Sequence, residues 1–596
     1  MNDRSKKIGI FEILRIAFPK CTKATPLLFG LLLVVEGLFA IISVIFVRIQ
    51  QCFFDKVTYA ITNKGFIKEV VIVLLIFMLI NILHHVIQGF HNVVPLAFQE
   101  KSTGFITYAL HKKLGNSKPI DFEDSEKLDR MNKATVGAAN ISKFVTCMVH
   151  IFMNHMVYFA LMTVYFYSLN PVLAIAILFV FVPSLLSQII RLKVYDKVED
   201  ESAPVRRKYE YYGQCLVGRE YIRETRLLGA FSYFRRLYIE ALDKMQYIKY
   251  KATTRTGIID LGLSVLTVLG YAGVLYLLFI SLLQGNISVG AFAAVYSSIG
   301  TMYAKMENMM NESIVEMAKN FATIKNYVEF VREDKVISEQ IKLDDKPVEI
   351  SVNNVSFKYP MAKENSLNDV NLVIHAGETI ALVGENGSGK TTLVKLLTGV
   401  YEPTTGDIAY NGTDIKKYDK SKLYEFTSAV FQKYQKYHMT LFDNLNISSS
   451  HKKKAKEELD IICVESGVEI NSDSFPNGYD TMISREYNGI DLSGGQWQRV
   501  AIARALCRDH QFVVFDEPTS AIDPFEETRI YNEFARIAKD KTAVIVTHRL
   551  GSVRLADRIF VLRQGEIVQI GTHDELVNVE GEYKRLFDSQ KQWYAI

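Results

Sequence analysis

The first half of the chain contains apolar runs that are long enough to cross a lipid bilayer. Each run reaches the ~20 residues that an α-helix needs to cross ~30 Å of hydrocarbon. Six such runs within the first 310 residues do not suit the buried helices of a soluble protein. The first run is too long for a signal peptide and is followed by another. The pattern predicts an α-helical six-span transmembrane domain over residues 1–330, with spans at about 24–47, 70–90, 144–168, 171–190, 257–283 and 289–310.

Lysine and arginine are distributed unevenly between the connections of these spans. The connections at 91–143 and 191–256 are rich in both residues, whereas those at 169–170 and 284–288 contain neither. Because basic connections stay on the cytoplasmic side of a membrane, both termini are expected in the cytoplasm. The two basic connections are long, and their residues favour helices that continue below the membrane.

The pattern changes after a charged, linker-like segment at 331–347. Short apolar stretches that suit strands, at 348–357, 379–383, 512–515 and 542–546, then alternate with helical patterns. This alternation predicts an α/β domain over residues 348–596.

A phosphate-binding motif stands between the second of these strands and a helix. Residues 384–391 read GENGSGKT, which satisfies the P-loop pattern. Its glycines let backbone N–H groups surround phosphates, Lys390 adds a positive charge, and Thr391 offers a hydroxyl to Mg²⁺. The nucleotide contacts predicted here are Gly384, Glu385, Asn386, Gly387, Ser388, Gly389, Lys390, Thr391 and Thr392.

Two acidic residues follow the apolar stretch at 512–515. Asp516 is placed to hold Mg²⁺, and Glu517 to polarise an attacking water as a general base. Surface carboxylates often follow strands, so the pair alone is weak evidence for a nucleotide site. Its position more than a hundred residues after a P-loop makes the evidence strong. The domain is predicted to be a P-loop NTPase that uses Mg²⁺.

Composition excludes some other classes of protein. The chain has 596 residues, 49% of them hydrophobic and 22% charged, which does not suit a disordered chain. The net charge of +4 gives no basic field for nucleic acid, so no nucleic-acid partner is expected. The six cysteines contain no CxxC pair and predict neither a zinc ribbon nor a disulfide scaffold.

A third motif carries a family resemblance. Residues 491–496 read DLSGGQ, which contains the LSGGQ signature of ATP-binding cassette (ABC) proteins. With the P-loop and Asp516-Glu517, it identifies the α/β domain as resembling an ABC nucleotide-binding domain. The resemblance implies that ATP lies between the P-loop of one copy and the signature of a second copy, so a homodimer is expected. The signature residues facing ATP would be Ser493, Gly494, Gly495 and Gln496.

Other positions match the family's pattern individually. The resemblance implies that Tyr359 stacks on adenine, that Gln432 senses Mg²⁺ and water, and that His548 orients the γ-phosphate. Asp523 matches the family's D-loop aspartate. Considered alone, these residues would equally suit a core tyrosine, a helix-surface glutamine and a strand-end histidine.

The order of the domains resembles that of exporter half-transporters over nearly the whole chain. The family places its coupling helices at segments that match about 121–128 and 217–226, although both would also suit solvated bends. One departure is that 481–492 is two residues longer than the common exporter pattern, which leaves the register of Glu486 uncertain. This region resembles bacterial half-transporters, several of which export lantibiotics or other modified peptides.

These observations predict an ATP-driven exporter in a bacterial plasma membrane, with a peptide as one candidate substrate. A lipid or multidrug exporter is the alternative, and an ATP-regulated sensor or channel is an alternative from another class; a heterodimer also remains open. No peptidase domain is expected, because about 23 residues precede the first span. Polar residues within the spans are candidates for a substrate cavity, although interhelical hydrogen bonds would also explain them. They are Glu36, His84, His85, His150 and His155.

Overall fold

The computed structural model describes residues 10–63, 67–309, 315–332, 346–449, 453–470, 473–517, 524–548 and 552–594. The chain divides into two compact units. The first comprises residues 1–116 and 129–333, and the second comprises residues 117–128 and 334–596. Most of the linker predicted at 331–347 and all of the D-loop around Asp523 lie outside the described residues.

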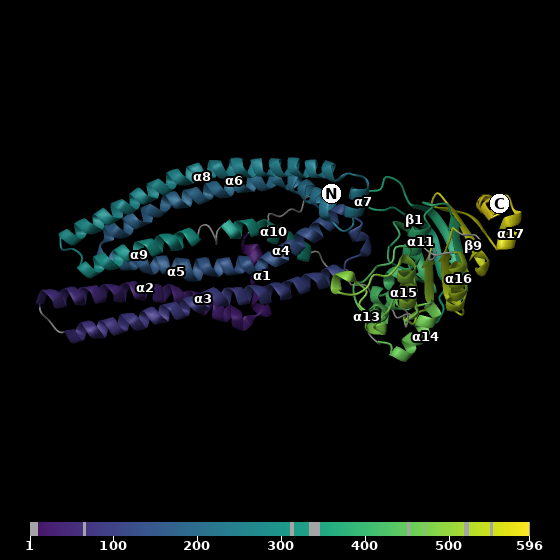
Figure 1. Cartoon of the computed structure of the whole chain (residues 1–596), viewed down its shortest axis with the longest axis horizontal. Helices are drawn as coiled ribbons and strands as arrows, with labels where there is room; N and C mark the ends of the chain where they lie inside the picture. Colours follow the sequence, from purple (N-terminus) through teal and green to yellow (C-terminus); the bar gives the residue numbers. More distant parts are fainter. Residues whose placement is uncertain are drawn as a thin grey trace. The chain divides into compact units, whose positions relative to one another are not determined.

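The first unit consists of helices (Figure 1). Long helices α2 and α3 form one antiparallel pair, and α6 and α8 form another, with α9 packed against α2. The helices are α1 (Ile10–Ala24), α2 (Pro26–Asn63), α3 (Ile67–Gly115), α4 (Ser125–Val149), α5 (Met156–Leu169), α6 (Pro171–Val217), α7 (Ile222–Leu227), α8 (Phe231–Leu283), α9 (Val289–Asn308) and α10 (Val315–Arg332).

Four helices among the described residues are long and apolar enough to cross a membrane. They are α2, α3, the continuous helix Ser125–Leu169 and α8. Only 6% of the apolar window of α3 and 17% of that of α8 is buried, so their apolar side chains face outward, as lipid-exposed helices require. The two remaining predicted spans, at 171–190 and 289–310, lie on α6 and α9, although residue 310 is outside the described part of the chain.

The helix that runs from α4 to α5 is interrupted by a π-helical turn at His150–His155. Such turns insert an extra residue into the helix and are frequent at functional sites. His150, Asn154 and His155 of this turn all line one cavity of the helical unit.

The second unit contains two β-sheets. One is antiparallel, in the order β2-β1-β4-β5, and the other has the order β10-β9-β3-β8-β7-β6. In the larger sheet β9, β3, β8, β7 and β6 are parallel, while β10 is antiparallel to β9. The strands are β1 (Ile350–Phe357), β2 (Leu367–Ile374), β3 (Thr379–Gly384), β4 (Thr405–Tyr410), β5 (Thr413–Asp414), β6 (Thr427–Val430), β7 (Phe512–Asp516), β8 (Thr542–Val546), β9 (Arg558–Arg563) and β10 (Glu566–Gly571).

The central strands are apolar on both faces because helices and the second sheet cover them. All five residues of β7 and of β8 are buried, as expected for parallel strands inside an α/β domain. The helices of this unit are α11 (Lys390–Leu397), α12 (Lys420–Phe426), α13 (Leu441–Asn446), α14 (Lys456–Ser466), α15 (Gly494–Leu506), α16 (Pro524–Ala538), α17 (His573–Asn578) and α18 (Glu582–Tyr594).

A short segment from the N-terminal half belongs to the second unit. Residues 117–128, which contain the 3₁₀ turn Pro119–Phe122, group with the α/β domain, and Ile120 packs against its core. The structure thus assigns one of the two charged segments singled out in the sequence to the α/β unit. The other, at 217–226, overlaps α7 in the helical unit.

Candidate functional site

Four parallel strands of the larger sheet lead to residues that the sequence analysis singled out. β3 runs into the P-loop, β6 is followed by Gln432, β7 ends at Asp516 before Glu517, and β8 is followed by His548. The carboxyl ends of parallel strands lie at one edge of a sheet, and ligands of α/β proteins bind there. The topology therefore collects these side chains from distant parts of the sequence.

The P-loop forms a tight turn before α11. Gly387 and Gly389 have φ of +82° and +104°, which side chains rarely tolerate, and a Cβ on Gly389 would lie 2.8 Å from the carbonyl oxygen of Ser366. The amino group of Lys390 donates to the carbonyl oxygens of Gly384 at 2.8 Å and Glu385 at 2.9 Å. Burial lowers the pKa of Lys390, because the charged amino group has lost contact with water. A phosphate beside Lys390 would stabilise that charge.

Asp516 and Thr391 form a second element of the site. The Thr391 hydroxyl donates to Oδ1 of Asp516 at 3.3 Å, while Oδ2 is buried and has no hydrogen-bond partner. Burial raises the pKa of Asp516 to about 6. A carboxylate oxygen without a partner next to a threonine hydroxyl suits Mg²⁺, which prefers oxygen ligands. The residues present therefore fit the metal that the P-loop chemistry implies.

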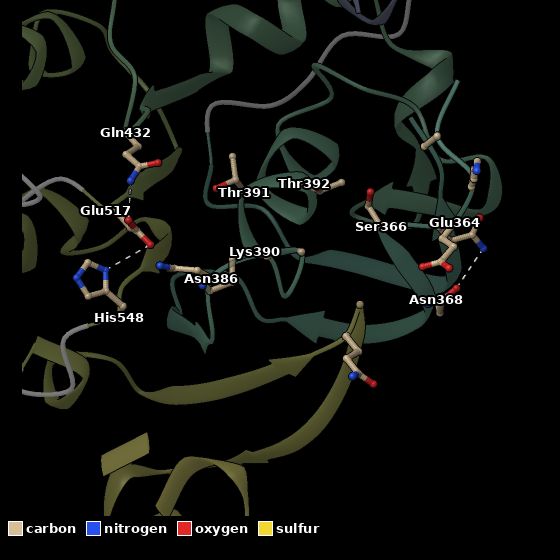
Figure 2. Close-up of a pocket in the computed structure, with 17 residues that line it drawn as sticks. Glu364, Ser366, Asn368, Asn386, Lys390, Thr391, Thr392, Gln432, Glu517 and His548 are labelled. Carbon is tan, nitrogen blue, oxygen red and sulfur yellow. Dashed lines mark hydrogen bonds and ion pairs between the residues drawn. The ribbon is translucent and has the colours of Figure 1, made fainter. Parts of the chain in front are cut away.

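Glu517 is held between two side chains (Figure 2). Nε2 of Gln432 donates to its Oε2 at 2.8 Å, and Nδ1 of His548 lies 3.4 Å from its Oε1. The Glu517 side chain is 12% exposed, and its backbone has a φ of +48°, an uncommon conformation for a non-glycine residue. Such local strain persists where the surrounding structure holds it. A largely buried carboxylate that two neighbours orient in this way is suited to accept a proton from water.

A cleft of about 1680 Å³ opens over these groups and is lined by Asn386, Lys390, Thr391, Gln432, Glu517 and His548. Tyr359 does not line it. Its ring instead packs edge-on against Phe357, and its hydroxyl lies 3.2 Å from that of Thr392. Sequence reasoning missed another group of lining residues, which carries no motif. These residues reach the cleft from the loop before β2, from the start of β2 and from the β9–β10 turn. They are Ala362, Lys363, Glu364, Asn365, Ser366, Asn368, Gln564 and Gly565.

The signature segment begins α15 and does not line this cleft. Ser493 caps the helix, because its hydroxyl accepts from the backbone of Gln496 while the Gln496 side chain accepts from the backbone of Ser493 at 2.8 Å. Tyr434 donates to the carbonyl oxygen of Gly494 at 2.7 Å, which ties the segment after Gln432 to the signature. Ser493 and Gly494 are exposed and available to another molecule.

The longer segment before the signature forms a compact turn. It contains the 3₁₀ helix Arg485–Tyr487 and returns through Gly489, whose N–H donates to the carbonyl oxygen of Ser484 at 2.9 Å. Glu486 lies with Oε2 3.7 Å from Nδ1 of His438, so it stands beside the loop that follows Gln432. This contact gives the position of Glu486 that the register left open.

Three of the five polar candidates within the spans line one cavity of about 560 Å³ in the helical unit. They are His84, His150 and His155. Glu36 is fully buried next to this cavity, whereas His85 is exposed and does not line it. His91, which the sequence analysis left outside the second span, also lines the cavity because α3 continues well beyond the apolar run.

Together, the fold and the site define a membrane protein with a P-loop ATPase domain. A family model described as ABC transporter matches residues 367–520. The subtilin transport ATP-binding protein SpaT of Bacillus subtilis is 30% identical over 544 residues, which are 88% of this chain and 86% of SpaT. The chain therefore belongs to the ABC transporter family, as an exporter-type half-transporter that couples ATP hydrolysis to transport.

Other similar proteins differ in the cargo that their names give. The putative multidrug export ATP-binding/permease protein YgaD of Bacillus subtilis is 36% identical over 52% of this chain and 53% of its own length. The ATP-dependent lipid A-core flippase of Haemophilus ducreyi is 33% identical over 57% of this chain and 58% of its own length. The structure of a bacterial Atm1-family ABC exporter with ATP bound has a TM-score of 0.75 at 20% identity and covers 97% of this chain and 99% of its own. That similarity shows the shared fold.

Proposed function

We propose that two copies of this chain form an exporter that moves a substrate out of a bacterial cell by alternating access. The observation that carries the proposal is the position of Glu517 between Gln432 and His548, beside the P-loop, in a chain with membrane-type helices. Residues 1–330 would form the transmembrane domain and residues 348–596 the nucleotide-binding domain. The basic connections support cytoplasmic termini in a plasma membrane.

In this proposal the P-loop, Glu517, Gln432 and His548 have separate roles in hydrolysis. Backbone N–H groups of the P-loop and Lys390 bind the β- and γ-phosphates of ATP. Glu517 accepts a proton from the attacking water, while Gln432 and His548 hold its carboxylate in place. Mg²⁺, when bound, neutralises phosphate charge, and Thr391, Gln432 and Asp516 would hold it. Tyr359 would stack on adenine after it turns from its contact with Thr392.

The position of the signature supports a dimer. Ser493, Gly494, Gly495 and Gln496 do not line the cleft of their own chain, yet Ser493 and Gly494 are exposed at the N-terminus of α15. A helix N-terminus attracts phosphate, because its N–H groups lack partners and its dipole is positive. A second copy would place this end over the γ-phosphate. Closure and opening of the two copies would drive the membrane helices.

A peptide is the substrate that we favour. SpaT, which matches over most of both chains, is named for the transport of subtilin, whereas the lipid A-core flippases match over a little more than half of their length. A lipid or a drug is the alternative cargo.

A stimulation screen tests this assignment. Purified protein in nanodiscs is mixed with lanthionine-containing peptides, lipid A or cationic drugs, and ATP hydrolysis is measured. A peptide is expected to raise hydrolysis and then to accumulate in inside-out proteoliposomes only when ATP is present. Stimulation by lipid A alone would identify a lipid as the substrate. Passive flux upon ATP binding without hydrolysis would show that the protein is a channel and not an exporter.

A further inference from the structure

The cavity of the helical unit is lined by an unusual number of basic side chains. Among the described residues, four imidazoles and the amino group of Lys305 line it, and no carboxylate does. The His155 side chain is among the buried groups, at 8% exposure, and its Nδ1 has no hydrogen-bond partner. The lining imidazoles belong to His84, His91, His150 and His155.

A buried carboxylate binds two of these imidazoles from one side. Oε1 of Glu36 lies 3.0 Å from Nδ1 of His91, and Oε2 lies 3.0 Å from Nδ1 of His150. The amide of Asn154 donates to Oε2 at 2.9 Å. Glu36 is fully buried, whereas the two histidine side chains are 21% and 22% exposed and reach the cavity. The carboxylate thus fixes both rings at the cavity wall.

This arrangement has the chemistry of a transition-metal site. One ligand atom each from Glu36, His91 and His150 lies within 4.8 Å of the others. Two imidazole nitrogens and one carboxylate oxygen are a common set for Zn²⁺, and three protein ligands leave a coordination position open. The two 3.0 Å distances end on different oxygens of Glu36, so each oxygen has one imidazole nitrogen close to the ~3.3 Å that separates two ligands of a tetrahedral zinc ion with bonds of ~2.0 Å.

The three residues come from different helices that enclose the cavity. Glu36 lies on α2, His91 on α3 and His150 at the start of the π-helical turn. The edge-to-face contact of the two rings, with centroids 5.2 Å apart, brings both toward the same carboxylate. An ion bound here would link all three helices.

The positive charge of Lys305 would repel a cation bound by Glu36, His91 and His150. Its amino group donates to Oδ1 of Asn154 at 3.2 Å and lies 4.4 Å from the centre of the Phe39 ring. Because Asn154 also contacts Glu36, the positive charge is one residue away from the carboxylate. Repulsion from Lys305 would weaken metal binding without occupying a ligand.

We propose that Glu36, His91 and His150 form a binding site for a divalent transition-metal ion of the zinc class, with its open coordination position facing the cavity. The alternative is a purely structural hydrogen-bonded cluster. The proposal is independent of the substrate assignment, since a metal here can be measured without nucleotide or cargo.

Zinc binding to the full-length protein tests the proposal. The protein is purified without a histidine tag, stripped with EDTA, desalted and titrated with Zn²⁺ in equilibrium dialysis, and Co²⁺ spectra report the ligand geometry. We expect one tight ion per chain. His91→Ala and His150→Ala should each lose at least about 100-fold in affinity, because loss of an outer-shell partner already costs about 10–100-fold and these variants remove a direct ligand. His85→Ala, which changes an exposed histidine of the same helix outside the cluster, is expected to bind as wild type.

Two further variants separate the possible outcomes. Glu36→Gln keeps the shape of the buried side chain and should also lose zinc, with elution as a single species confirming that it folds. Lys305→Gln should bind zinc on the order of tenfold more tightly, because it removes a repelling charge. Equal zinc binding by wild type, His91→Ala and His150→Ala would overturn the proposal, as would weaker binding in Lys305→Gln. Such a result would leave ATP-driven export untouched.

Discussion

Tyr401 donates a 2.6 Å hydrogen bond to Oε1 of Glu123, which links the segment 117–128 to the aromatic group beside the P-loop helix. The Tyr401 ring packs against that of Phe357 and lies edge-on to Tyr359, whose hydroxyl meets Thr392. Burial and the neighbouring carboxylate of Glu123 raise the pKa of Tyr401, so the phenol keeps its proton at neutral pH. A continuous set of contacts therefore runs from Glu123 to α11.

Replacing Tyr401 by Phe should remove the hydrogen bond to Glu123 and keep the ring contacts with Phe357 and Tyr359. We expect the unfolding free energy of the nucleotide-binding domain to fall by about 1 kcal/mol, since a hydrogen bond to a partly exposed carboxylate is lost. For a domain of this size the loss corresponds to a melting temperature lower by about 2–4 °C, measurable by calorimetry of the full-length protein. Tyr424→Phe removes only a long 3.5 Å hydrogen bond to Gly399 and serves as the control. Equal decreases in melting temperature in both variants would show that the hydrogen bond from Tyr401 to Glu123 does not stabilise the domain.

The raised pKa of Asp516 predicts a pH-dependent stability. In the folded state the pKa of Asp516 is about 6, whereas the pKa of an aspartate in the unfolded chain is ~3.9. Between these two pH values the folded protein binds a proton that the unfolded chain has released. The unfolding free energy therefore decreases as pH rises from about 4 to about 6 and stays lower above that range, by roughly 2–3 kcal/mol.

Asp516→Asn removes this ionisation and should be more stable than wild type at pH 7.5 without Mg²⁺ and ATP. The advantage should shrink at pH 5, while Mg²⁺-dependent ATP hydrolysis is lost at every pH. Thermal unfolding of both proteins at several pH values between 5 and 7.5 measures the difference. A stability gap that does not change with pH would show that burial of the Asp516 charge is not its cause.

Glu517→Gln tests the proposed general base. We expect steady ATP hydrolysis to fall by about 10²–10⁴-fold, because the amide cannot accept the proton from water. ATP should still raise the melting temperature, since the P-loop is unchanged. Glu364→Gln makes the same substitution in an exposed residue of the same cleft and should hydrolyse ATP at nearly the wild-type rate. Turnover of Glu517→Gln within a few-fold of wild type would remove Glu517 from this role.

The parts of the site that could be predicted from sequence are those carried by local motifs. A P-loop must join a strand to a helix, and Asp516 must follow a buried strand, so parallel topology alone brings these residues to one edge. The residues that escaped prediction reach the cleft by long-range packing. Gln564 and Gly565 lie in the turn between β9 and β10, and nothing in their local sequence indicates a neighbouring P-loop.

The membrane half shows a different limit of sequence analysis. Hydrophobicity locates where a helix meets lipid, but it does not locate where the helix ends. The second apolar run stops near residue 90, while α3 continues to Gly115. The apolar pattern therefore places His91 in a connection, although His91 contacts Glu36. The π-helical turn at His150–His155 likewise depends on packing between helices, and no periodicity of the chain predicts it.

In the proposed dimer, each ATP site is built from the P-loop of one copy and the signature of the other. Lys390→Ala and Ser493→Arg each inactivate both sites of a homodimer. A mixed dimer with Lys390→Ala on one chain and Ser493→Arg on its partner retains one complete site. A dimer with both substitutions on one chain and none on the other retains no complete site, although it carries the same two changes.

The most direct measurement is therefore the ATPase rate of these two mixed dimers, isolated through different tags on the two chains. We expect measurable hydrolysis when the substitutions are on separate chains and background hydrolysis when they are on the same chain. The opposite ranking, with activity only where an unmodified chain is present, would show that each chain hydrolyses ATP alone and would contradict the shared site.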